Sequence, residues 1–241
     1  MPAMIETHLP RCCSPLDDHW PFTQPLAGVQ LISTHFDPGR LDEGDYTAAG
    51  VPLVRGVAKR QAEHLAGRVC AREALYRVTG VASVPAVGDD RAPQWPAQVS
   101  GSITHGQGWA AAIVAPARHW RGLGLDVERL LSSERAERLV GEILTADELV
   151  RIADLSPEQR AWRISLTFSL KESLFKALYP LVLTRFYFQD AELLSLDTAQ
   201  QTAQLRLIID LGEEWPTGSE LEGYYAELDG QILSLVAIAH P

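Results

Sequence analysis

The chain has 241 residues, of which 46% are hydrophobic and 22% are charged, and its formal net charge at pH 7 is -10. This length and balance suit a globular protein with a sizeable core, in one large domain or two small ones. The negative charge argues against general nucleic-acid binding, because phosphate backbones attract basic surfaces.

The cysteines and the apolar segments favour a reducing compartment. Cys12, Cys13 and Cys70 have no metal-ligand spacing and predict no disulfide framework. Residues 1–11 lack the apolar core of a signal peptide, and the longest apolar run, over residues 109–117, is too short to span a bilayer. We therefore expect a cytoplasmic protein without a membrane or nucleic-acid partner.

The first half of the chain predicts one long helix among short strands and loops. Apolar residues at helical spacing and the stop signal Gly80 define the helix. The expected segments are an irregular arm (1–26), a strand (29–34), a loop with a short helical turn (37–54), the helix (57–79), a proline-rich connection (84–98) and two strands (99–105 and 109–115).

Basic side chains recur every four residues along one face of the long helix, with one more beside them: Arg60, His64, Arg68, Arg72 and Lys59. One interpretation is a solvated face that Glu63 and Glu73 partly neutralise. The other is a cradle for a phosphorylated ligand, because Arg and Lys are the usual phosphate-binding residues.

The second half predicts the same coarse plan, so the expected fold class is α+β. Capping patterns at Thr145 and Ser156 mark helix starts, and Asp229-Gly230 marks a hairpin turn. The expected segments are a strand (122–128), a helix from residue 132 or 133 to about 140, a second helix from 145, a long helix (156–178) ending before Pro180, and strands at 185–188, 203–209, 224–228 and 232–239.

Two carboxylates lie in the strand at 122–128. Asp126 and Glu128 are two residues apart, so in a strand both side chains project from the same face. Two like charges at that distance repel each other unless a cation or protons lie between them. Gly122 and Gly124 leave the backbone bare, so we expect a ligand to approach it closely.

A second acidic centre lies on the long helix of the second half. Glu172 and Lys176 are four residues apart and share a face, which is also the pattern of a simple surface ion pair. Three carboxylates suit Mg²⁺, which shares its shell with waters and substrate phosphates; Mn²⁺ is the alternative. With the basic residues, they predict a metal-dependent enzyme acting on a phosphoanhydride or phosphodiester.

The motifs resemble those of a known family. Gly124-Leu-Asp126-Val-Glu128, followed by Phe168-Ser-Leu-Lys171-Glu172-Ser-Leu-Phe-Lys176, is similar to the signatures GxDxE and WxxKExxxK of the phosphopantetheinyl transferases, with Phe168 in place of the usual Trp. Residues 59–72 resemble the amino-terminal motif of the Sfp-type enterobactin-synthase branch, and residues 101–105 its central motif. Within this family, the chain resembles the broad-specificity carrier-protein synthases of pseudomonads.

The resemblance implies a fold and a reaction. The fold would be two similar α+β halves, residues 1–122 and 123–241, related by pseudo-twofold symmetry with coenzyme A between them. One chain would act as a monomer. A serine hydroxyl of an apo acyl or peptidyl carrier protein would attack the phosphorus bearing pantetheine, and adenosine 3′,5′-bisphosphate would leave.

The resemblance also implies roles for individual residues. Asp126, Glu128 and Glu172 would hold the metal, Glu172 or a metal-bound water would take the serine proton, and Lys176 would stabilise charge on the transferred phosphate. The expected contacts to coenzyme A come from Lys59, Arg60, Arg68, Arg91, Thr104, His105, Lys171 and Lys176. For Lys171, a structural ion pair is the alternative.

Two other functions fit parts of the pattern: a metal-dependent phosphodiesterase or nuclease, and a non-catalytic protein that binds coenzyme A or a nucleotide. The three carboxylates with Lys176 favour an enzyme, and the net charge disfavours a nuclease. The carrier would dock on residues after the acidic strand, namely Arg129, Arg135, Arg138 and Leu139, unless these belong to a solvated helix.

Overall fold

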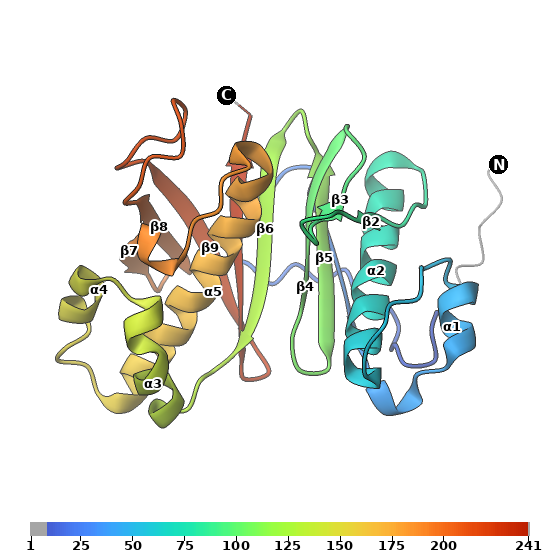
Figure 1. Cartoon of the computed structure of the whole chain (residues 1–241), viewed down its shortest axis with the longest axis horizontal. Coiled ribbons are helices and arrows are strands. Elements are labelled where there is room, and N and C mark those ends of the chain that lie inside the picture. Colours follow the sequence, from blue (N-terminus) through green and yellow to red (C-terminus); the bar gives the residue numbers. More distant parts are fainter. Residues whose placement is uncertain (1–8, 241) are drawn as a thin grey trace.

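The computed structural model describes residues 9–240, so the start of the expected irregular arm lies outside the described residues. Two sheets lie side by side, and one long helix packs against each of them (Figure 1). The α+β class predicted from the sequence is confirmed. No helix in the described part of the chain is long and apolar enough to cross a bilayer.

The first half forms the smaller sheet, in the strand order β1-β5-β4, with α2 packed on β1 and β5. The expected helix and strands are confirmed here, and the expected loop at 37–54 contains two short helices. The elements are β1 (Gln30–His35), η1 (Pro38–Arg40), α1 (Glu43–Ala48), α2 (Ala58–Thr79), β2 (Ala86–Val87), β3 (Pro93–Gln94), β4 (Val99–His105) and β5 (Trp109–Pro116).

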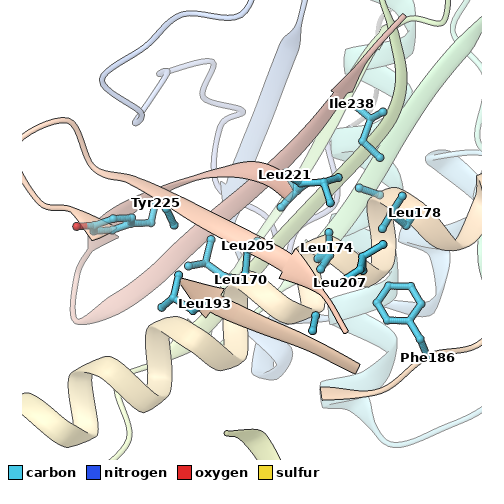
Figure 2. Close-up of a cluster of buried hydrophobic side chains, with 14 of the residues drawn as sticks. Leu170, Leu174, Leu178, Phe186, Leu193, Leu205, Leu207, Leu221, Tyr225 and Ile238 are labelled. Atoms are coloured by element: carbon cyan, nitrogen blue, oxygen red, sulfur yellow. The ribbon is translucent and has the colours of Figure 1, made fainter. Parts of the chain in front are cut away.

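The second half forms the larger sheet, in the order β6-β10-β9-β8-β7. Leu170, Leu174 and Leu178 of its long helix α5 point into the core against this sheet (Figure 2). The elements are β6 (Trp120–Arg129), α3 (Ser133–Ile143), α4 (Ala146–Arg151), α5 (Pro157–Val182), η2 (Phe188–Asp190), β7 (Ala191–Asp197), β8 (Thr202–Leu207), β9 (Glu220–Leu228) and β10 (Gln231–Ala239).

The two halves repeat one topology. In each, a strand leads into the long helix, and a later antiparallel hairpin returns so that its last strand pairs with the first strand. The order β1-β5-β4 therefore corresponds to β6-β10-β9, and β7 and β8 extend the second sheet. The pseudo-twofold axis and a boundary at residue 122, which falls within β6, remain predictions.

Three hydroxyls of β4 join the halves. Ser100 Oγ donates to the carbonyl of Trp120 at 2.6 Å. The side chains of Ser102 and Thr104 each accept a hydrogen bond of 3.1 Å from a β6 backbone N–H, those of Leu125 and Val127. Because alternate strand residues share a face, the hydroxyls form one row along the junction.

Two sequence predictions fail after residue 178. Helix α5 does not end before Pro180 but continues to Val182. A proline costs a backbone hydrogen bond and a clash with the carbonyl four residues earlier, and here the helix bears that cost for less than one turn before it ends. Leu183 ends the helix with φ 53°, and its N–H bonds to the carbonyl of Tyr179. The segment at 185–188 is not a strand, since its apolar pattern comes from Phe186, which is buried against the core.

The sequence prediction also missed β7, residues 191–197, which forms the outer strand of the larger sheet. Its inner residues alternate only over a short stretch, so the period-2 pattern is weak. The three cysteines are free thiols, and all three are buried.

The glycines of β6 have a different role from the one predicted. A Cβ at Gly122 would lie 2.4 Å from the carbonyl oxygen of Ala177, and one at Gly124 would lie 1.8 Å from that of Ser173. The bare backbone is therefore covered by α5 and not by a ligand. These glycines let the helix lie directly on the strand.

This packing predicts a large difference between two glycine substitutions. Gly124→Ala should lower the free energy of unfolding by about 3 kcal/mol, because the helix must move away from the strand. Gly141→Ala is the matched control, since a Cβ there meets nothing within 4 Å, and it should stabilise α3 by about 1 kcal/mol. Urea unfolding of both variants measures this, and equal stability of Gly124→Ala and the wild type would contradict the packing.

Candidate active site

Asp126 lies at the contact between β6 and α5. Its carboxylate is buried, and Lys176 Nζ donates to Oδ1 at 2.6 Å and to the carbonyl of Leu125 at 3.1 Å. Ser169 Oγ donates to Oδ2 at 2.9 Å. Both oxygens of Asp126 therefore have fixed partners, and both partners belong to α5.

Serines of α5 form a polar row beneath this contact. Ser169 and Ser173 are fully buried and lie 2.7 and 2.8 Å from Ser234 Oγ on β10. One turn earlier, Ser165 Oγ accepts from the backbone N–H of Leu131 at 2.9 Å. The sequence prediction missed these residues, although three serines spaced by four in an apolar helix were a visible signal.

Glu128 and Glu172 are half-buried beside Asp126. Burial, together with the charges of Asp126 and Glu172, raises the pKa of Glu128 to about 7, against the opposing charge of Lys176. Burial and the charge of Asp126 also raise the pKa of Glu172. The three carboxylates thus repel one another, and for Asp126 and Glu128 the sequence predicted this repulsion.

This donor set fits a magnesium ion. Among residues 9–240, no three Asp, Glu, His or Cys side chains converge on one point, and Lys176 forms an ion pair with Asp126. However, Mg²⁺ usually takes one or two protein carboxylates and completes its shell with waters and substrate phosphates. A divalent ion would also relieve the repulsion that raises the pKa of Glu128.

A cleft of about 670 Å³ opens at the junction of the halves. The first half contributes residues 90–95 and 99–103, and the second contributes residues 121–123 and parts of 175–185. The cleft combines cations with aromatic rings, which suits a ligand that has both phosphates and flat apolar groups. Its cationic and aromatic lining consists of Arg91, Arg121, Lys176, Arg185, Trp95, Phe175 and Tyr179.

Arg91 and Lys176, two of the predicted contacts to coenzyme A, line this cleft. The sequence prediction did not include Arg121, Arg185 and Trp95, which line it as well. Arg121 forms a bidentate ion pair with Glu214, so its charge is already neutralised in this structure. Arg185 has no hydrogen-bond or ion-pair partner in the part of the chain that the structure describes.

The basic stripe of α2 divides into exposed and buried members. Lys59 and Arg60 are exposed, and Lys59 lies 3.8 Å from Glu63. Arg68 is only 6% exposed, and its Nη1 has no hydrogen-bond partner within the described residues, nor does either ring nitrogen of His64. Burial lowers the pKa of His64 to about 4, so its ring is neutral at pH 7.

The last residues of β4 differ in their surroundings. Thr104 is buried, and its hydroxyl is used to hold β6, so it positions the junction. His105 is half-exposed, with Nδ1 3.9 Å from the carboxylate of Glu63. Of the two, His105 is therefore the one available to a ligand.

Lys171 makes the structural ion pair and not the expected phosphate contact. Its buried Nζ donates to Glu148 Oε2 at 2.7 Å and to the carbonyls of Ile143 and Phe188 at 2.8 Å each. An ammonium has three protons, so these bonds use all of them. Lys171 thereby ties α5 to the start of α4 and to η2.

Family models match both halves of the chain. Residues 51–115 match the 4′-phosphopantetheinyl transferase N-terminal domain, and residues 122–229 match the 4′-phosphopantetheinyl transferase superfamily.

Curated relatives agree with these matches. Enterobactin synthase component D of Shigella flexneri is 40% identical over 157 residues, which cover 64% of this chain and 72% of that protein. The protein of the same name from Salmonella typhi is 35% identical over 192 residues, covering 79% and 78%. The 4′-phosphopantetheinyl transferase Svp of Streptomyces mobaraensis is 35% identical over 195 residues, covering 78% and 76%.

Solved structures give weaker matches. A holo-ACP-synthase from Plasmodium yoelii shares 16% identity over 51% of this chain and 97% of that chain, with a TM-score of 0.39. A holo-(acyl-carrier-protein) synthase from Bacillus anthracis, in complex with CoA (3′,5′-ADP), shares 16% identity over 51% and 99%, with a TM-score of 0.34. Because the identities and TM-scores are this low, nothing about the present site is inferred from these two structures.

The chain belongs to the 4′-phosphopantetheinyl transferase superfamily. It is an enzyme that transfers the phosphopantetheine group to carrier proteins. The expected likeness to pseudomonad carrier-protein synthases remains a prediction.

The raised pKa of Glu128 predicts that metal binding depends on pH. A metal ion that binds Glu128 must displace its proton below about pH 7, so Mg²⁺ affinity should then fall by up to about tenfold per pH unit. Calorimetric titration of Mg²⁺ into the coenzyme A complex between about pH 8 and pH 6 measures this. In Glu128→Gln, binding should be weaker and less dependent on pH, and a pH-independent wild-type affinity would contradict the prediction.

The buried ion pair of Lys171 predicts a loss of stability on truncation. Lys171→Met leaves the Glu148 carboxylate buried without its cation and should cost about 3 kcal/mol in urea unfolding. The double variant Lys171→Met/Glu148→Met should lose less than the two single losses added together. If Lys171→Met kept the wild-type stability and showed a large rise in KM for coenzyme A, Lys171 would be a phosphate contact after all.

Proposed function

We propose that the cleft binds coenzyme A and that Asp126, Glu128, Glu172 and Lys176 form the centre at which a carrier serine attacks. The bond between the serine Oγ and the phosphorus that bears pantetheine forms, and the bond to adenosine 3′,5′-bisphosphate breaks. One observation supports this most strongly: Lys176 lines the cleft and also donates to Asp126 at 2.6 Å. A single side chain therefore joins the phosphate-binding space to the carboxylates.

Asp126, Glu128 and Glu172 would hold Mg²⁺, with Mn²⁺ as the alternative ion. When bound, the ion supplies positive charge that neutralises the pyrophosphate of coenzyme A. The chain's own contribution is to fix the position of Asp126, through Ser169 and Lys176, before any ligand arrives. Preorganised charges of this kind lower the barrier because they need not rearrange during the reaction.

Lys176 and Glu172 take the two remaining roles. The ammonium of Lys176 is held between Asp126 and the Leu125 carbonyl, from where it stabilises negative charge on the transferred phosphate. Burial raises the pKa of Glu172. Glu172 accepts the proton of the attacking serine, either directly or through a water. A carboxylate with a raised pKa is a stronger base than an exposed one.

The remaining phosphate of coenzyme A is assigned to the basic face of α2. Arg68 and His64 present buried N–H groups without hydrogen-bond partners among residues 9–240, and such groups are costly unless a ligand or water satisfies them. Exposed Lys59, Arg60 and Arg91, together with His105, add contacts around it. In this proposal Thr104 acts on the junction and not on the ligand.

The proposed acceptors are apo acyl and peptidyl carrier proteins, which both present a serine. Because the cleft takes residues from both halves of one chain, the proposed active form is a monomer. A cytoplasmic location is part of the same proposal, since coenzyme A and carrier proteins are found there.

Intact-protein mass spectrometry tests the reaction. The protein is mixed with an apo acyl carrier protein, coenzyme A and Mg²⁺, with EDTA added to a parallel sample. A carrier mass increased by one phosphopantetheine, and unchanged with EDTA, is the expected result. An unmodified acyl or peptidyl carrier, with coenzyme A bound to folded protein, would contradict the proposal and support a binding role.

Two substitutions test the residue roles in the same assay. Asp126→Asn and Lys176→Met should each lower kcat at least about a hundredfold, because each removes charge from the reacting centre. Coenzyme A binding should remain measurable by calorimetry, since the α2 and cleft contacts persist. Ser156→Ala, at a helix cap away from the centre, is the control that should keep its activity.

A further inference from the structure

A second pocket, of about 180 Å³, lies beside the cleft, and two side chains of the proposed reacting centre line different pockets. Glu172 lines the second pocket, whereas Lys176 lines the cleft. Phe175 and Arg185 line both and so form the partition. The proposed base, Glu172, therefore faces the second pocket, whereas the proposed phosphate-binding Lys176 faces the cleft.

The partition is held in place by aromatic packing. The ring of Phe175 stacks on Tyr179 at 5.1 Å and packs against Phe186 at 5.3 Å. Phe186 is only 5% exposed and belongs to the core between α5 and the larger sheet (Figure 2). The buried ring of Phe186 thus fixes the segment at 183–187 to the core.

The outer side of this segment is exposed. We call residues 183–187, between the end of α5 and η2, the docking edge. Leu183 is 76% exposed and Tyr187 is 71% exposed, although both are large and apolar. Between them, exposed Arg185 has neither a hydrogen bond nor an ion pair with any described residue. The edge runs from the cleft, which Leu183 lines, to the second pocket, which Tyr187 lines.

We propose that the acceptor carrier protein docks on this edge and presents its serine to Glu172 through the second pocket, while Arg185 pairs with a carboxylate of the carrier. The inference rests on the proposed function of the site. It adds the place of entry of the second substrate and the residues that recognise it.

Reaction geometry supports separate entrances. In phosphoryl-type transfer, the attacking and leaving oxygens lie roughly in line on opposite sides of the phosphorus. The leaving adenosine bisphosphate occupies the cleft in this proposal, so the serine must arrive from another side. The second pocket provides that side, because Glu172 is its one carboxylate.

Charge and composition support a protein partner. The chain has a net charge of -10, so an unpaired arginine beside the base supplies local attraction for an acidic surface. Tyr and Arg are enriched where interfaces carry most of their binding energy. A neighbouring apolar side chain such as Leu183 gives that contact the area to bury.

The surface predicted from the sequence is less available. Arg138 pairs with Glu134 at 2.8 Å, and Arg129 donates to Gln107 at 3.0 Å. The side chain of Arg135 has no hydrogen bond or ion pair among residues 9–240, but it lines neither pocket. Two of these three arginines are thus already engaged, whereas Arg185 is unpaired among the described residues and lines both pockets.

Steady-state kinetics with an apo acyl carrier protein tests the proposal. Tyr187→Ala, at a residue that lines only the second pocket, should raise KM for the carrier by about tenfold and leave KM for coenzyme A unchanged. Arg185→Glu should raise KM for the carrier at least as much, and its KM for coenzyme A is measured alongside because Arg185 also lines the cleft. Arg118→Glu is the matched control, because Arg118 is an exposed arginine in the turn between β5 and β6 that lines neither pocket. It should keep both KM values. Thermal unfolding confirms that all three variants fold.

The possible failures are distinguishable. A wild-type protein that leaves the carrier unmodified would overturn the proposed function itself. A working wild type in which Arg185→Glu keeps its carrier KM would overturn the docking edge alone. A rise in KM for coenzyme A alone in Arg185→Glu would limit Arg185 to the cleft and overturn its role in docking.

Discussion

The structure depends on one close contact, that of helix α5 with strand β6. Gly122 and Gly124 remove the side chains that would keep them apart, and the backbone carbonyls of Ser173 and Ala177 fill the space. The contact sets the distance between Asp126 on the strand and Lys176 on the helix. Both substrates of the proposed reaction meet at that pair, so a packing constraint and a chemical constraint coincide.

The repeated topology explains where the cleft lies. Each half is one long helix on a small sheet, and a row of hydroxyls from β4 holds the second half against the first. Because these bonds use side chains and not a backbone ladder, the sheets meet without merging. The cleft takes residues from both sides of that junction, which suits a large ligand such as coenzyme A.

The sequence correctly predicted that Asp126, Glu128, Glu172 and Lys176 lie near one another, because spacing within one element determines which side chains share a face. The two-residue step from Asp126 to Glu128 and the four-residue step from Glu172 to Lys176 each needed only local geometry. The likeness to two family motifs then placed both pairs in one site. The long helix α2 and the strands on either side of it followed from periodicity in the same way.

What failed depended on packing between elements. Lys171 lies about 100° round the helix from Glu172, and only the folded chain shows that this side faces α4 and η2. The glycines of β6 were correctly interpreted as sites of close approach, but the partner is a helix and not a phosphate. Arg185 gave no sequence signal, because its importance comes from lying between two pockets.

A crystal structure of the protein with coenzyme A and Mn²⁺, with an anomalous map at the manganese edge, tests the central claim most directly. The account predicts one anomalous peak bound by carboxylates among Asp126, Glu128 and Glu172, with the pyrophosphate in the cleft beside Lys176. A peak away from these carboxylates, or a pyrophosphate out of reach of Lys176, would contradict it.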